Sequence, residues 1–130
     1  MKILVAEDDV DQLSLRCLLL NAGGFETLPA SDGSSAIELA TAEKPQCAVV
    51  DLRLPTDEVG WRLISALKRL DPKIHVVVLT GVRAEGLHRR PEATLVDEII
   101  VKGSSSVHLI QTLQSIADLG NAGVKRLSGG

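Results

Sequence analysis

The sequence predicts an α/β fold with a five-stranded parallel sheet and helices on both of its faces. Five short apolar runs alternate with stretches whose apolar residues recur at helical spacing, and this alternation is typical of parallel sheets. The run IHVVVL at 74–79 is apolar nearly throughout, as expected for a strand covered on both faces. The length of 130 residues suits one hydrophobic core, so we expect a single domain.

The first half of the chain predicts two strands, each followed by a helix. Apolar residues spaced three and four apart define the helical faces, and Pro within the second strand suggests an edge position. In order, the predicted elements are a strand at Lys2–Ala6, a helix from Val10 (stripe Val10, Leu13, Cys17 and Leu20) capped by Asp9 and ended by Gly23-Gly24, a strand at Phe25–Pro29, a turn at Ser31–Gly33, and a helix striped by Ala36, Ile37 and Ala40.

The second half predicts three further strands and a less regular connection before the last of them. Gly86, Pro91 and the Arg89-Arg90 pair leave no clean stripe over Gly81–Thr94, so a short or irregular helix is expected there. The other predicted elements are strands at Cys47–Val50, Ile74–Leu79 and Val96–Val101, a helix striped by Val59, Leu63, Leu67 and Leu70 and stopped by Asp71-Pro72, and a last helix striped by Val107, Ile110, Leu113 and Ile116. We therefore expect a domain over residues 1–118 and a Gly-rich tail or linker over 119–130.

Composition excludes several classes of function. There are 14 Lys and Arg against 17 Asp and Glu, a net charge of −3, and aromatic residues make up only 2%. We therefore expect no direct nucleic-acid binding, because both a basic face and a base-stacking surface are missing. No apolar stretch approaches the roughly 18–20 residues that span a membrane, and no signal peptide opens the chain. A cytoplasmic location without membrane contact is expected.

The two cysteines, Cys17 and Cys47, fit neither a metal-ligand spacing nor a C-x-x-C motif. Both lie at or beside apolar patterns, which favours buried reduced thiols. A bridge between them stays open at this point.

Polar residues follow four of the predicted strands where each apolar run stops. Because the carboxyl ends of parallel strands share one sheet edge, these residues are expected to converge there. Clustered carboxylates repel one another, and a hard cation such as Mg²⁺ relieves the repulsion. A metal, an oxygen nucleophile and donors for phosphate oxygens together suit phosphoryl transfer. The residues are Glu7-Asp8-Asp9, Asp51, Thr80-Gly81 and Lys102-Gly103.

Each of these residues also has an ordinary interpretation on its own. Asp9 suits a helix cap, Asp51 a loop carboxylate, Thr80 a strand end and Lys102 a solvated surface lysine. The phosphoryl-transfer site can be rejected only if the ordinary interpretation holds for all four residues at once, which favours the site.

Four pieces of the chain resemble the receiver domain of two-component response regulators: ILVAEDD at 3–9, VVDLRLP at 49–55, VVLTG at 77–81 and IIVKG at 99–103. The resemblance covers about residues 1–118. It implies a flavodoxin-like three-layer fold with strand order 2-1-3-4-5. It further implies a phospho-accepting signalling switch and not an enzyme that turns over a free substrate.

The resemblance also implies roles for individual residues. Asp51, with Pro55 in place, accepts a phosphoryl group from a sensor histidine kinase or a histidine phosphotransfer protein. Thr80 supplies the hydroxyl that follows the phosphoryl group, and Lys102 the ammonium that pairs with it. The implied Mg²⁺ ligands are Glu7, Asp8, Asp51 and the backbone carbonyl of Arg53, with Asp9 as a possible third acid.

Three features depart from the family pattern. Gly103 follows the lysine where the family usually has a proline after a cis bond, so the Lys102–Gly103 bond is expected to be trans. Ile99 replaces an aromatic residue, and the loop after Pro55 is one residue longer than usual. These departures retain the phosphorylation chemistry and predict a switching route that differs from the usual one.

The sequence leaves two alternative functions. A pseudo-receiver would use the same fold as a docking module that is never phosphorylated, and the changed switch positions favour it slightly. A phosphatase of the haloacid-dehalogenase type needs D-x-D after its first strand, which Glu7-Asp8-Asp9 does not supply. No helix-turn-helix follows residue 118, so the output is expected from an effector domain or target protein that the sequence does not identify.

Overall fold

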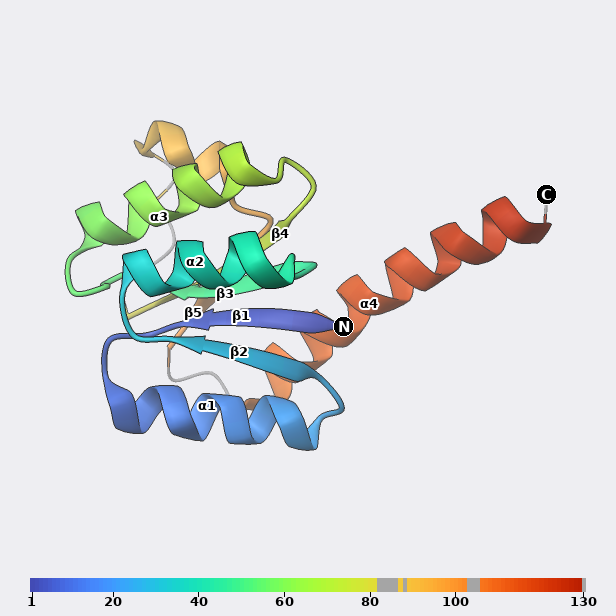
Figure 1. The fold of residues 1–130 in the computed structure, drawn as a ribbon, viewed down its shortest axis with the longest axis horizontal. Coiled ribbons are helices and arrows are strands. Elements are labelled where there is room, and N and C mark those ends of the chain that lie inside the picture. Colours follow the sequence, from blue (N-terminus) through green and yellow to red (C-terminus); the bar gives the residue numbers. More distant parts are fainter. Residues whose placement is uncertain (82–86, 88, 103–105, 130) are drawn as a thin grey trace.

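The computed structural model describes residues 1–81, 87, 89–102 and 106–129, in which a parallel sheet lies between two layers of helices (Figure 1). The strand order is β2-β1-β3-β4-β5 and every neighbouring pair is parallel, which confirms the predicted fold class and strand order. In chain order the elements are β1 (Lys2–Ala6), α1 (Val10–Ala22), β2 (Glu26–Ala30), α2 (Gly33–Glu43), β3 (Cys47–Asp51), α3 (Asp57–Leu70), β4 (His75–Thr80), the 3-10 helix η2 (Pro91–Leu95), β5 (Glu98–Val101) and α4 (Ser106–Gly129).

All five predicted strands are present, and their ends agree with the prediction to within two residues. β2, which contains Pro29, lies at one edge of the sheet as predicted, because proline cannot donate a hydrogen bond to a second neighbouring strand. The central strands β1, β3 and β4 are buried over almost their whole length. Continuous apolar runs therefore did indicate strands covered on both faces.

Helices α2 and α3 cover one face of the sheet, and α1 with the first half of α4 covers the other (Figure 1). Successive residues of a strand point to opposite faces. In β1, Leu4 and Ala6 accordingly join the core cluster on the α2–α3 side, whereas Ile3 and Val5 join the cluster on the α1–α4 side. Two separate cores therefore hold the carboxyl edge of the sheet in place from both sides.

The predicted helix caps are confirmed. The Asp9 carboxylate accepts a hydrogen bond from the Gln12 amide at 3.1 Å, and the Asp32 carboxylate accepts one from the Ser35 amide at 2.7 Å. These bonds satisfy amides that have no partner within the helix. The Asp9 cap starts α1 only three residues after β1, so it also fixes the path of the acidic segment between them.

Helix α3 lies very close to the loop that follows β3. A Cβ atom at Gly60 would be only 1.9 Å from the backbone oxygen of Leu52, so the helix can approach this closely only because Gly60 has no side chain. Leu52 directly follows Asp51, and α3 thus packs against the loop that leaves the end of β3.

Three predicted helical stripes need correction at their ends. Val10, Val107 and Leu70 are 65%, 57% and 46% exposed. On α4 the buried residues are Leu109, Leu113 and Ile116, because four- and three-residue steps follow the 3.6-residue turn better than the uniform three-residue steps of the predicted stripe. The helix is therefore rotated relative to the predicted face.

The segment 119–130, predicted as a Gly-rich tail or linker without a periodic pattern, is helical as far as Gly129 because α4 continues through it. Extending an existing helix adds one hydrogen bond for each residue fixed, so an established helix can run through residues of low propensity. Figure 1 shows this end of α4 projecting away from the sheet. None of the helices in the described part of the chain is long and apolar enough to cross a membrane.

The segment Gly81–Thr94 was predicted to hold a short or irregular helix. Within the described residues this is confirmed by the 3-10 helix η2 at Pro91–Leu95. Residues 82–86 and 88 lie outside the described residues, and so does Gly103, on which the expected trans bond depends.

Arg90 connects η2 to α3. Its Nη1 donates to Glu58 Oε1 at 2.6 Å, its Nε lies 3.3 Å from Glu92 Oε2, and its guanidinium carbon is 5.6 Å from the ring centroid of the buried Trp61. This stacking of a cation on an indole face is favourable. Arg90 thereby links the end of the segment between β4 and η2 to the first turns of α3.

Cys17 and Cys47 are both free and buried, as expected, so the possible bridge is excluded. Burial raises the pKa of the Cys47 thiol to about 12, and the nearby Asp97 adds to the shift. The thiol is therefore an apolar core group at neutral pH.

Candidate functional site

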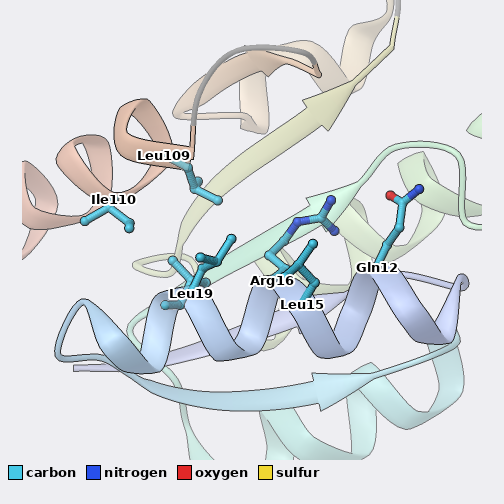
Figure 2. Close-up of a pocket in the computed structure, with 7 residues that line it drawn as sticks. Gln12, Leu15, Arg16, Leu19, Leu109 and Ile110 are labelled. Carbon is cyan, nitrogen blue, oxygen red and sulfur yellow. The ribbon is translucent and has the colours of Figure 1, made fainter.

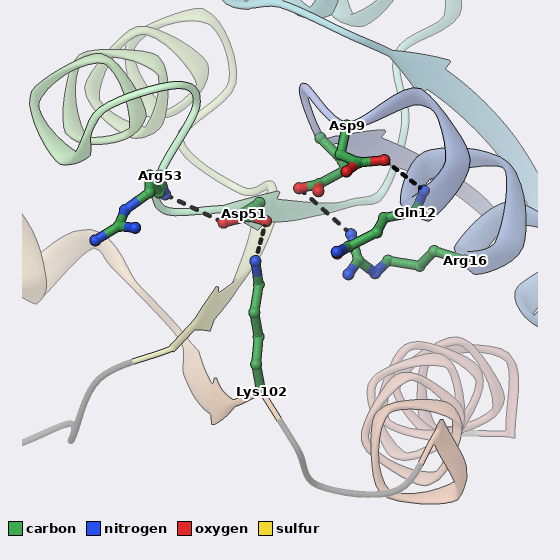
Figure 3. A network of polar contacts seen from close by, with 7 residues as sticks. Asp9, Gln12, Arg16, Asp51, Arg53 and Lys102 are labelled. Carbon is green, nitrogen blue, oxygen red and sulfur yellow. Dashed lines mark hydrogen bonds and ion pairs between the residues drawn. The ribbon is translucent and has the colours of Figure 1, made fainter.

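Polar residues from four strands lie at the carboxyl edge of the sheet, as the sequence predicted. Figure 3 shows Asp51 and Lys102 pointing toward each other there. Glu7 follows β1, Asp51 ends β3, Thr80 ends β4 and Lys102 follows β5. The strands are held in register by the cores on both faces, so the positions of these side chains are set by rigid elements. Lys102 is exposed, as its ordinary interpretation predicted, but its ammonium also contacts the buried Asp51 carboxylate.

Asp51 is the centre of the contacts at this edge. Its side chain is only 2% exposed. One carboxylate oxygen, Oδ2, accepts a hydrogen bond from Lys102 Nζ, and the other, Oδ1, accepts one from the Arg53 amide at 3.1 Å. Burial acts to raise the pKa of Asp51, but the hydrogen bonds with Glu7 and Lys102 outweigh it and lower the pKa below its usual value. Asp51 is therefore held as a carboxylate.

Glu7 is the second buried carboxyl group of the site, also 2% exposed, and it is hydrogen-bonded to Asp51. Burial is the main cause that raises the pKa of Glu7 to about 8, and Asp51 adds to the shift, whereas Arg16 and Lys102 oppose it. Two neighbouring carboxyl groups avoid repulsion by retaining a proton. Burial and Asp51 thus favour a proton on Glu7, whereas the nearby Arg16 and Lys102 favour its charged form.

Arg16 reaches the site from α1, on a different side of the acids from Lys102 (Figure 3). Its Nη1 is 3.7 Å from Glu7 Oε2, and the Arg16 side chain is 15% exposed. Neither atom has a hydrogen-bond partner among the residues that the structure describes, although both are buried. The ion pair is therefore one of charge alone.

A small cavity of about 180 Å³ opens beside Asp51. Thr80, which lies on its wall, is 3% exposed, and the Thr80 carbonyl accepts a hydrogen bond from the Lys102 amide at 2.6 Å. The cavity is large enough for a phosphate-sized group, and Thr80 and Lys102 both line it. The lining residues are Asp51, Leu52, Arg53, Asp57, Thr80, Gly81 and Lys102.

Asp8 and Asp9 are both exposed, in contrast to Glu7. The Asp9 side chain caps α1, which confirms the ordinary interpretation of this residue. Within residues 1–81, 87, 89–102 and 106–129, no three His, Cys, Asp or Glu side chains are arranged to hold a metal ion. The acids that the structure brings together are Glu7 and Asp51.

The family model for the response regulator receiver domain matches residues 3–114. The chain belongs to this family. Its fold is also that of a response regulator receiver domain protein (CheY-like) from Methanospirillum hungatei, with a TM-score of 0.82 and 21% identity over 93% of this chain and 96% of the other. The sequence-based assignment of a receiver domain is thus confirmed.

Two curated relatives of this receiver domain carry names from signalling. The transcriptional regulatory protein PrrA of Mycobacterium tuberculosis is 34% identical over 80 residues, which cover 62% of this chain and 34% of PrrA. Sporulation initiation phosphotransferase F of Bacillus subtilis is 30% identical over 83 residues, or 62% of this chain and 64% of the relative. The chain thus spans less than two thirds of either relative.

Receiver domains generally bind Mg²⁺ at an acidic pocket, and the donor groups of this receiver domain fit that ion. Glu7 and Asp51 are two buried carboxyl groups in contact, and Glu7 Oε2 has no hydrogen-bond partner among the described residues. Mg²⁺ commonly takes one or two carboxylates and completes its shell with water and phosphate oxygens. An unsatisfied buried acid oxygen is where such a cation would be accepted.

Sequence reasoning missed two residues of this site. Arg16 was not considered because it lies nine positions after Glu7, a separation that no local motif spans. Asp57, which lines the cavity, lies in the longer loop and helix start after Pro55. Ile99, in place of the family's aromatic residue, is half-buried and packs against the core on the α2–α3 side. The sequence does contain one signal for Arg16: it directly precedes Cys17 of the apolar stripe of α1, so a basic side chain lies next to the buried face of this helix.

Proposed function

We propose that this receiver domain accepts a phosphoryl group on Asp51 and acts as the phospho-accepting switch of a two-component phosphorelay. The observation that carries the proposal is the arrangement around Asp51: a buried carboxylate at a phosphate-sized cavity, with Lys102 on one oxygen and the Arg53 amide on the other. The proposed donor is a sensor histidine kinase or a histidine phosphotransfer protein, and the proposed location is the cytoplasm.

The proposed chemistry is an in-line transfer. The bond between phosphorus and the donor's imidazole nitrogen breaks, a bond from phosphorus to an Asp51 oxygen forms, and the imidazole leaves with the electron pair. The Asp51 carboxylate has four lone pairs, and the hydrogen bonds with Lys102, the Arg53 amide and Glu7 occupy three of them, which leaves one for attack. Lys102 and the Thr80 hydroxyl then face the transferred oxygens, where preorganised donors are most effective.

Mg²⁺ is the proposed cofactor, with Glu7, Asp51 and the Arg53 carbonyl as ligands and Asp8 as a further acid at the exposed side. When bound, the ion would neutralise charge on the carboxylates and on the phosphoryl oxygens. The domain is proposed to assist its own phosphorylation and dephosphorylation without turning over a free substrate. Residues 119–129, as the projecting end of α4, are proposed to connect residues 1–118 to an effector or target.

The decisive test is phosphoryl uptake from a small donor. Incubation of the full chain with acetyl phosphate and Mg²⁺, followed by intact-mass measurement, is expected to give one phosphoryl adduct per chain. The adduct should be absent when EDTA replaces Mg²⁺. Failure to form an adduct with Mg²⁺ present would instead identify a pseudo-receiver, and steady hydrolysis of a phosphomonoester would identify a phosphatase.

Mg²⁺ is also expected to stabilise the unphosphorylated domain. A ligand that binds only the folded state at a hundredfold excess over its Kd adds about 2.7 kcal/mol to the free energy of unfolding. The melting temperature should therefore rise by several degrees with Mg²⁺, and Glu7→Gln should remove most of this gain. The matched control is Glu38→Gln on the exposed side of α2.

Asp8 is tested in the same measurement. If Asp8 is a ligand, Asp8→Ala should reduce the gain from Mg²⁺. A gain equal to that of the parent chain would remove Asp8 from the ligand set, and an unchanged gain in Glu7→Gln would place the metal elsewhere.

A further inference from the structure

Arg16 joins the outer surface of the domain to its buried acid pair. From α1 its side chain reaches along a groove of about 330 Å³ between α1 and α4 (Figure 2). The groove is otherwise lined mainly by apolar residues, among them Leu19 and Leu109. At the tip of the Arg16 side chain, Nη1 lies 3.7 Å from Glu7 Oε2. The aliphatic stem is thus packed and the guanidinium faces the site.

The contact between Arg16 and Glu7 is one that a stronger cation can replace. The two facing atoms are buried and have no hydrogen-bond partner within the described residues. At 3.7 Å the pair lies beyond hydrogen-bond length, so charge attraction is what joins them. Replacing the guanidinium at Glu7 Oε2 by another cation therefore breaks no hydrogen bond.

Charge balance at the site is the second observation. Each of the two buried carboxyl groups has its own cation from the chain: Lys102 contacts Asp51, and Arg16 faces Glu7. The sequence predicted one ammonium, that of Lys102, and a Mg²⁺ ion beside the acid cluster, but no second cation from the chain. With Arg16 present, an incoming Mg²⁺ meets acids that already have counter-charges.

We propose that Arg16 is a positioning residue that serves as the counter-ion of Glu7 in the metal-free domain and thereby weakens Mg²⁺ binding. This inference rests on the proposed function, because it assumes that Glu7 is a Mg²⁺ ligand. Arg16 sets how much Mg²⁺ the domain needs before the acid pair is ready for phosphoryl transfer.

The expected effect is large enough to measure. A charge within about 4–6 Å of a carboxyl group changes its affinity for a proton by tenfold or more. The positive charge of Arg16 also repels a Mg²⁺ ion bound at Glu7, and Mg²⁺ carries twice the charge of a proton. Removal of the Arg16 charge removes this repulsion. Arg16→Gln is therefore expected to lower the Kd for Mg²⁺ by about tenfold.

The experiment is a calorimetric titration of the full chain with MgCl₂. The parent chain, Arg16→Gln, Arg16→Lys and Arg69→Gln are compared. Arg16→Lys keeps the charge and should restore a Kd near that of the parent. Arg69→Gln removes the same charge from an exposed position in the last turn of α3 and should leave the Kd unchanged. If Arg16→Gln fails to fold, Arg16→Met replaces it, because Met retains an aliphatic stem in the groove.

The double variant Glu7→Gln with Arg16→Gln tests whether Arg16 acts through Glu7. In a chain that carries Glu7→Gln, the substitution Arg16→Gln should no longer tighten Mg²⁺ binding. An unchanged or higher Kd for Arg16→Gln, with Mg²⁺ binding in the parent, overturns the inference alone. Absence of Mg²⁺ binding in the parent and in Arg16→Gln overturns the inference together with the proposed metal site.

Discussion

Asp51→Asn is expected to abolish the phosphoryl adduct completely. Asparagine has almost the shape of aspartate but presents an amide in place of a nucleophilic carboxylate oxygen. Asp51 is 2% exposed and fixed by Lys102 and the Arg53 amide, so an isosteric side chain should remain in position. The loss of the adduct can then be attributed to the missing nucleophile. Intact mass after acetyl phosphate treatment measures the outcome, and thermal melting checks that the variant is folded.

Asp57→Asn is the matched control for this prediction. Asp57 lines the same cavity, begins α3 and is exposed, so it is the other acid that a small phosphodonor would meet there. Its variant is expected to form the adduct as the parent chain does. Retention of the full adduct by Asp51→Asn would refute the assignment of Asp51, and loss of the adduct in Asp57→Asn alone would move the assignment to Asp57.

Gly60→Ala is expected to destabilise the domain by about 2–3 kcal/mol or more, as overpacking at a site without room does. The new Cβ would lie 1.9 Å from the Leu52 backbone oxygen, and a backbone atom cannot turn aside as a side chain can. Ala favours a helix over Gly by about 1 kcal/mol, but this gain is smaller than the cost of displacing α3. Urea denaturation gives the free energy of unfolding.

Gly33→Ala provides the comparison within the same chain. Gly33 begins α2, and a Cβ there would have no atom within 4 Å. Its substitution should leave stability unchanged or raise it by up to about 1 kcal/mol, the helix preference of Ala over Gly. Equal stability of Gly60→Ala and the parent chain would mean that α3 can move away from Leu52 at little cost.

The fold was predictable because its signals are local. The central strands β1, β3 and β4 are nearly continuous apolar runs that stop at polar residues, and parallel pairing then brings the polar ends together. Asp51 and Lys102, 51 positions apart, were assigned to one site on this basis, and their contact confirms it. A spacing argument succeeds here because the sheet edge gives each strand end a known place.

The missed features depend on tertiary packing. No local pattern relates Arg16 to Glu7, because their contact depends on how α1 packs against the sheet. The exposure of Val107 likewise depends on the rotation of α4, which its own sequence does not fix. The continuation of α4 beyond residue 118 could not be predicted in this way, because a high glycine content is typical of a flexible linker. Propensity there is overruled by the helix that precedes it.

The contact between Arg90 and Trp61 provides an intrinsic fluorescence probe of the domain. Trp61 is the one tryptophan of the chain, so all indole fluorescence comes from this side chain. The Arg90 guanidinium lies over its ring. Arg90 belongs to the segment that follows β4, and Trp61 belongs to α3. Indole fluorescence responds to a nearby positive charge, so its intensity and wavelength register any change in the distance between these two elements. The coupling between them can be followed in the natural sequence without an attached dye.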